Sequence, residues 1–112
     1  MIVDKWSYKE LQEFILEDIE EFLGDGLDIR QASSRVQVEY AKSIKESELE
    51  KLIIYMALCE EGVKHGFLRD DIKEQTQELL GRIDLGYCDQ QLSDEERLKL
   101  RDDIKRTLSL LS

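Results

Sequence analysis

Carboxylates are the most abundant chemically active side chains in the chain, and they gather near its start. The segment EFILEDIEEFLGDG, residues 13–26, contains six acids and neither lysine nor arginine. Neighbouring carboxylates can serve as general acids and bases or attract a basic surface. Acid–base work needs tuned pKa values, which an outward-facing helix surface does not supply. The spacing of these acids within their helix therefore decides between the two uses.

The remaining reactive groups are one histidine and two cysteines. His65 follows Glu61 at helical spacing, but a metal site normally needs three or four ligands. The histidine is followed by GFLR, whereas histidine phosphotransfer domains typically carry lysine three and glycine four residues after the histidine. Cys59 lies in the apolar run LIIYMALC, where a reduced thiol behaves as a small hydrophobe. Together with Cys88 it makes no disulfide framework.

The sequence also lacks the motifs of common enzymes and of nucleic-acid-binding proteins. There is no Gly-rich phosphate loop, Cys/His nucleophile pair or Ser-His-Asp set. The segment DIRQASSRVQVEY offers only Arg30 and Arg35 to a DNA groove, on a strongly acidic chain. We therefore predict no enzyme activity, no cofactor and no metal.

Helices must position these acids, and the sequence marks where the helices begin. The pattern Ser/Asp-x-x-Glu/Gln, which caps a helix, occurs at Ser7, Asp28, Ser47 and Ser93. Apolar residues recur at helical spacing after each. Another helix begins near Asp70, where acids favour the first turn. The predicted helices cover about residues 8–23, 29–44, 48–64, 71–84 and 94–111, and GYCDQQLSD is a loose connection between the last two.

The helix predicted over 48–64 is the most apolar and is expected at the centre of the fold. KLIIYMAL could also be a buried strand, but the chain offers no partner strand. The last helix is expected to bury Leu100, Ile104, Leu108 and Leu111. Trp6 precedes the Ser7 cap and is expected to pack on Leu11. The fold class is all-α, a compact bundle of four to five short helices in a single helical domain over residues 1–112.

On the first helix the acids form one face. At 100° per residue they fall within an arc of about 100°, opposite the apolar stripe, with Phe14 on the border. The acids of this face are Glu10, Glu13, Glu17, Glu20 and Glu21. They are either a solvated face, with Phe14 packed under a loop, or a docking surface with Phe14 as its anchor.

Charge is distributed unevenly along the chain. The net charge is −10, and residues 1–25 alone contain eight acids and two bases. Residues 89–112 contain six acids and five bases, which is typical of an ordinary helix surface. The excess of acid argues against nucleic acid and anionic membranes as partners and favours a basic protein. No apolar leader or membrane-length run is present, so a cytoplasmic location is expected.

Four segments resemble, in order, one known family: WSYKELQEFI, GLDIRQASSRVQVEY, ESELEKLIIYMAL and LSDEERLKL. They are similar to the third-numbered family of small all-α bacterial immunity proteins of polymorphic toxin systems. The resemblance spans most of the chain and rests on segment order and acidity. It implies an intracellular protein that binds and neutralises a cognate toxin domain.

Residues and resemblance together give one hypothesis. The partner is a basic toxin domain, a nuclease being one candidate, and it docks on Glu10, Glu13, Phe14, Glu17, Glu20 and Glu21. If these acids are only solvated, the partner site falls elsewhere, around Arg30, Arg35 and the turn after residue 64. The alternative function is an acidic helical adaptor or regulatory subunit for another protein.

Overall fold

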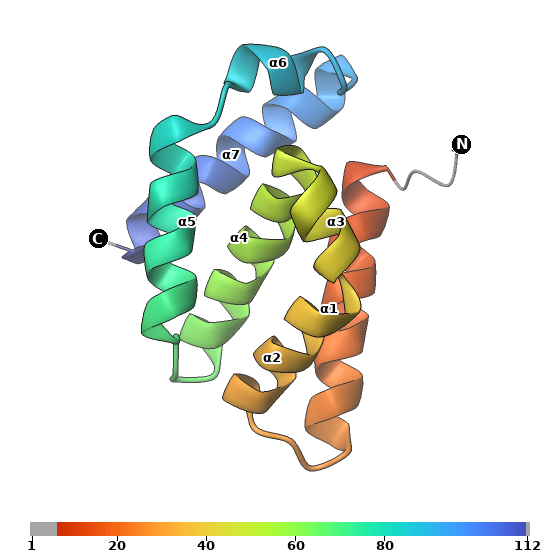
Figure 1. The fold of residues 1–112 in the computed structure, drawn as a ribbon, viewed down its shortest axis with the longest axis vertical. Helices are drawn as coiled ribbons and strands as arrows, with labels where there is room; N and C mark the ends of the chain where they lie inside the picture. Colours follow the sequence, from red (N-terminus) through yellow and green to blue (C-terminus); the bar gives the residue numbers. More distant parts are fainter. Residues whose placement is uncertain (1–6, 112) are drawn as a thin grey trace.

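The computed structural model describes residues 7–111 and shows an all-α fold, with seven helices and no strand in that range (Figure 1). The predicted fold class is therefore confirmed, although the described chain has more helices than expected. The position of Trp6 lies outside the described residues. The helices are α1 (Tyr8–Gly24), α2 (Ile29–Glu39), α3 (Ala41–Glu46), α4 (Glu48–Lys64), α5 (Asp70–Arg82), α6 (Leu85–Asp89) and α7 (Asp94–Leu111).

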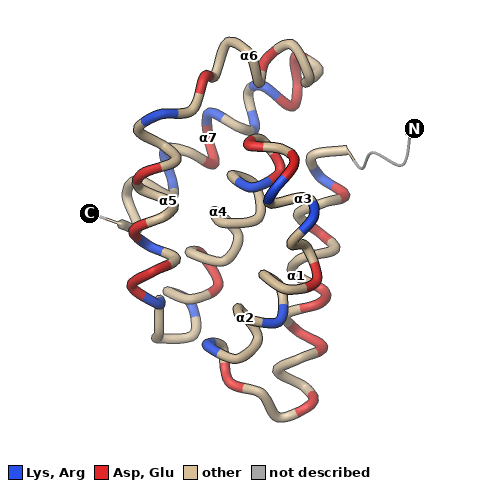
Figure 2. Tube along the Cα trace, viewed as in Figure 1, with Lys and Arg blue, Asp and Glu red and all other residues tan. Residues whose placement is uncertain are grey.

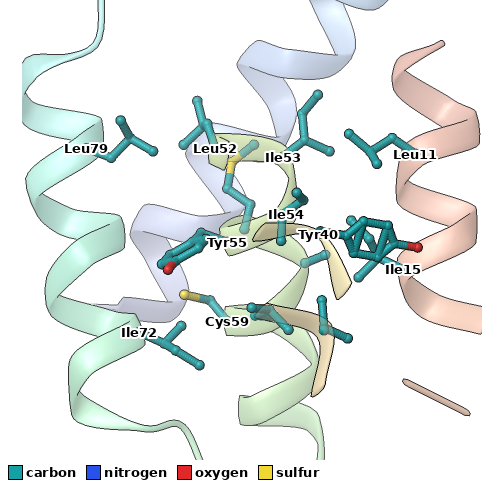
Figure 3. Close-up of a cluster of buried hydrophobic side chains, with 14 of the residues drawn as sticks. Leu11, Ile15, Tyr40, Leu52, Ile53, Ile54, Tyr55, Cys59, Ile72 and Leu79 are labelled. Atoms are coloured by element: carbon teal, nitrogen blue, oxygen red, sulfur yellow. The ribbon is translucent and has the colours of Figure 1, made fainter. Parts of the chain in front are cut away.

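Helix α4 is the centre of the fold, as its apolar sequence predicts. It contacts α1, α2, α3, α5 and α7, which surround it in Figure 1. Every residue from 52 to 59 is buried, because a helix that is apolar on all sides must be covered on all sides. In Figure 3 Leu11 and Ile15 reach this core from α1, and Ile72 and Leu79 reach it from α5.

The predicted helix starts are present, and their caps fix where α1, α2, α4 and α7 begin. At Ser7, Asp28 and Ser93 the cap side chain accepts from the third residue's backbone N–H, and that residue's side chain accepts from the cap N–H. At Ser47 the hydroxyl accepts from the N–H of Glu50 at 3.2 Å. Each bond satisfies a backbone donor that the first turn leaves without a helical partner.

The helix predicted over 29–44 is instead divided at Tyr40, so a single helix there was wrong. Tyr40 has φ −102° and ψ 20°, ends α2 and begins α3. Its hydroxyl donates a 2.6 Å hydrogen bond to Asp18 on α1. The change of direction lets α2 pack on α1 while α3 packs on α4. One straight helix would not serve both contacts.

Two further expectations were wrong in detail. The stretch expected to be loose contains α6, whose start is capped by Asp84 accepting from the N–H of Tyr87 at 3.1 Å. Cys88 on this short helix is buried in the core. Leu108 was expected inside but is 50% exposed, because the stripe of α7 that faces the core runs through Leu100, Asp103, Thr107 and Leu111.

Candidate functional site

The acids predicted to form a face on α1 are all exposed. Figure 2 shows acidic positions in red along this helix. The buried side of the helix consists of Tyr8, Leu11, Ile15 and Ile19, which follow helical spacing into the core. The acidic face therefore points to solvent and comprises Glu10, Glu13, Glu17, Glu20 and Glu21. The helical spacing of α1 alone accounts for the exposure of these residues.

Two members of the predicted site already have partners inside the protein. Glu10 completes the cap of α1, because its carboxylate accepts from the N–H of Ser7 at 3.0 Å. Glu13 lies 3.9 Å from the ammonium of Lys9, with both side chains exposed. An exposed ion pair of this kind contributes little to stability. Glu10 thus has a structural task in α1, while Glu13 is only weakly engaged.

The other three carboxylates have no such partners in the part of the chain that the structure describes. Among residues 7–111, no lysine, arginine or histidine lies within ion-pair distance of Glu17, Glu20 or Glu21. Glu13–Glu17 and Glu17–Glu21 are like-charge pairs at i,i+4, each costing about 0.2–0.5 kcal/mol in a helix.

Their position along α1 adds to this cost. Glu20 and Glu21 occupy the last turns of α1, near the negative end of the helix dipole, and no basic residue is there to offset them. Helices α4, α5 and α7 instead have acids in their first turns, where the dipole stabilises them. Glu20 and Glu21 are therefore placed against the intrinsic preference of the helix, whereas Glu10 lies in its favourable first turn.

Phe14 is 36% exposed on the border of the acidic face. Leu16, which borders the face on its other side, is exposed to the same degree. The acids are thus flanked by partly exposed apolar side chains on the surface of α1. An apolar residue beside a charged rim is the usual composition of an interface centre.

Negative charge continues from α1 to the neighbouring end of α2, which sequence reasoning did not detect. Burial, and then the hydrogen bond to Asp18, raise the pKa of the Tyr40 hydroxyl. The charges of Glu39 and Glu17 raise this pKa further, so both carboxylates act on the same point. Glu17 and Glu39 are 22 residues apart in the sequence, so their proximity appears only once the helices are packed.

A pocket of about 390 Å³ lies at the other end of the acidic face. It forms where the C-terminal end of α1 meets the start of α2 and the turn after α4. Its lining residues are Leu23, Asp28, Ile29, Arg30, His65 and Phe67. Arg30 and this turn belong to the second surface that the sequence suggested, whereas Arg35 instead stacks over Phe22, 5.8 Å from the ring centroid.

His65 ends α4 as its C-cap and is a surface residue. Its Nε2 lies 3.6 Å from the buried carboxylate of Glu61. Within residues 7–111, no three histidine, cysteine or acidic side chains are grouped to hold a metal ion. None of the described helices is both long and apolar enough to cross a membrane.

Fold and surface together define a small acidic all-α protein whose distinctive features are an exposed acidic helix and an adjoining pocket. A family model described as "Immunity protein Imm3" matches residues 4–112, nearly the whole chain. The chain therefore belongs to the Imm3 family of immunity proteins, and this family implies a protein that binds a cognate toxin. No curated protein and no solved structure matches the chain significantly.

Proposed function

We propose that this immunity protein neutralises its toxin by binding it through the acidic face of α1. One observation supports this most strongly. Glu17 repels Glu20 and Glu21, the latter two also lie near the negative end of the helix dipole, and among the described residues no base offsets the three. Such an arrangement costs stability in the isolated protein. A basic surface on the toxin would supply the absent counter-charges.

Binding then works by electrostatic steering followed by occlusion. Complementary charge raises the association rate of two proteins far more than it raises affinity at the rim of an interface. A toxin domain with a basic substrate cleft, such as a nuclease, would be attracted to the acids and covered by α1. The immunity protein needs no cofactor and no catalysis for this task, and it acts in the cytoplasm.

Removing the charge of the acidic face without changing its shape tests the proposal. A variant with Glu17→Gln, Glu20→Gln and Glu21→Gln should fold, because all three side chains are exposed. It should associate with the toxin domain at least tenfold more slowly than the wild type does. The association rate of the wild type should fall as salt is added, and that of the variant should depend less on salt.

The matched control removes the same number of charges from other helices. The control carries Glu74→Gln, Glu95→Gln and Asp102→Asn, at positions on α5 and α7 that are likewise exposed. This control should bind and protect cells as the wild type does. The proposal is wrong if the α1 variant is folded, binds at the wild-type rate and still protects cells.

A further inference from the structure

We propose that the pocket between the ends of α1 and α4 receives an apolar side chain of the same toxin domain. This inference rests on the proposed function and adds to it the anchor that fixes the toxin after electrostatic encounter. The occupant is an aliphatic or aromatic side chain on a toxin segment whose neighbouring residues are basic. The argument starts from how the two helices end.

Helices α1 and α4 end in the same way, in a Schellman motif that needs a glycine. Gly26 has φ 98° and Gly66 has φ 81°, which other residues rarely adopt. After α1, the N–H of Leu27 donates to Phe22 O at 3.1 Å. After α4, the N–H of Phe67 donates to the carbonyl of Gly62 at 2.8 Å. Both turns are therefore closed by backbone hydrogen bonds.

The turn after α4 displays an aromatic ring instead of burying it. The residue that packs against the end of the helix is Leu68, whose Cδ1 would lie 3.2 Å from a Cβ added at Gly62. Phe67 is left 47% exposed. Its ring forms a wall of the pocket and has the guanidinium of Arg30 5.4 Å from its centroid. The turn already fixes the backbone that carries this ring, so little backbone entropy is lost there when a partner binds.

Apolar side chains form half of the lining of the pocket, and the polar side chains of the other half already have partners within the protein. Leu23, Ile29 and Phe67 supply apolar walls. Arg30 has the carboxylate of Asp28 at 3.5 Å, and His65 has Glu61 at 3.6 Å. A charged guest would have to compete with these pairs, whereas an apolar guest would bury the walls without disturbing them. The pocket therefore selects an apolar side chain.

The chemistry of the surroundings identifies which partner brings that side chain. Leu23 follows Glu20 by three residues on α1, and such positions are neighbours on a helix surface. The pocket thus adjoins the Glu20 edge of the acidic face, and a segment that fills the pocket and covers this edge lies beside Glu20. Basic residues on that segment would meet this carboxylate. Charge complementarity commits the occupant to the basic toxin domain and not to a second, equally acidic copy of this chain.

Dissociation kinetics test the anchor separately from the acidic face. The probe is the cognate toxin domain, separated from the immunity protein in denaturant and refolded. Phe67→Ala should dissociate at least tenfold faster while its association rate and salt dependence stay at wild-type values. Phe67→Leu, which keeps an apolar wall, should restore most of the loss. Leu98→Ala, an exposed apolar residue on α7, is the matched control and should change nothing.

Hydrogen exchange on the wild-type complex gives a readout that does not depend on any variant folding. Backbone amides of residues 28–30 and 65–68 should gain protection when the toxin domain binds. Unchanged protection there, or unchanged dissociation of a folded Phe67→Ala, overturns the inference. If the glutamine variant of α1 still slows association, the proposed function stands without the anchor. If Phe67→Ala dissociates faster but the glutamine variant of α1 associates at the wild-type rate, the anchor is supported and the acidic face is rejected.

Discussion

The hydroxyl of Tyr8, in the first turn of α1, donates a 2.8 Å hydrogen bond to Oδ2 of Asp103 on α7. Asp103 is only 2% exposed. The same oxygen accepts from Gln12 at 2.8 Å, and Oδ1 accepts from Arg106 at 2.7 Å. Lys99 lies 3.6 Å away. A buried carboxylate with this many donors is well compensated, and it joins α1, the helix that carries the acidic face, to α7.

Tyr8→Phe removes one of these donors and should lower the free energy of unfolding by about 1–3 kcal/mol. The ring still fills its space, so the loss reports on the hydrogen bond. Equilibrium unfolding in urea measures it. Tyr87→Phe, at an exposed tyrosine on α6, is the control and should leave the urea midpoint unchanged. Equal midpoints for Tyr8→Phe and wild type would show that the bond contributes nothing.

Stability should fall at alkaline pH because of Tyr8 and Tyr40. Burial raises the pKa of Tyr8, helped by its hydrogen bond to Asp103, and burial with the Asp18 bond raises that of Tyr40. Above the ordinary tyrosine pKa of about 10, the unfolded chain releases these protons while the folded chain keeps them. The unfolded state then binds fewer protons, so the free energy of unfolding decreases as pH rises.

The double variant Tyr8→Phe with Tyr40→Phe measures this effect. Urea unfolding at about pH 8 and about pH 11 should show a smaller loss of stability in the double variant than in the wild type, because the tyrosine protons are gone. Both proteins also carry Cys59 and Cys88, whose contribution cancels in the comparison. Identical losses in the two proteins would contradict the assignment.

The features that the sequence predicted are those fixed by neighbours in the chain. The caps at Ser7 and Asp28 and the apolar stripe of α1 need only local spacing, and they are present. The break falls at Tyr40, whose hydroxyl is bonded to Asp18 of another helix. Helix α6 is anchored by the burial of Cys88 in the core, which no local pattern shows. Long-range packing therefore decided the features that were missed.

The candidate site shows the same division. Exposure of Glu17, Glu20 and Glu21 follows from the period of one helix. The pocket beside them needs the ends of α1 and α4 to meet, although the segments GDGL and HGF, containing Gly26 and Gly66, do mark both helix ends in the sequence. A local pattern gives the end of each helix but not what lies next to it.

Two glycines should respond oppositely to alanine. A Cβ at Gly62 would lie 2.9 Å from the carbonyl oxygen of Phe67 and 3.2 Å from the Cα of Leu68, both backbone atoms. Gly62→Ala should destabilise the protein by about 1–3 kcal/mol and disturb the turn. At Gly81, within α5, nothing lies within 4 Å, so Gly81→Ala should stabilise it by about 0.5–1 kcal/mol. Thermal melts that move in the same direction would contradict this packing.

Neither thiol should react quickly in the native protein. Cys59 is fully buried and its Sγ donates to the hydroxyl of Thr76 at 3.3 Å, while Cys88 is buried on α6. Burial raises the pKa of both thiols, which lowers the thiolate fraction. A chromogenic thiol reagent should label both slowly in buffer and at once in denaturant. Rapid native labelling of Cys59 would contradict the position of α4 at the centre.

Phe14 should matter to the complex more than to the fold. It is 36% exposed at the border of the acidic face, where a toxin covering α1 would bury it. Phe14→Ala should therefore leave the association rate near the wild-type value, because steering depends on charge, and should speed dissociation by about tenfold, equivalent to about 1.4 kcal/mol. Leu108→Ala, an exposed apolar residue on α7, is the control and should change neither rate. Surface plasmon resonance with immobilised toxin domain separates the two rates. Unchanged dissociation of Phe14→Ala would mean that the toxin covers the acids without reaching the Phe14 side of α1, leaving the pocket at Phe67 as the anchor.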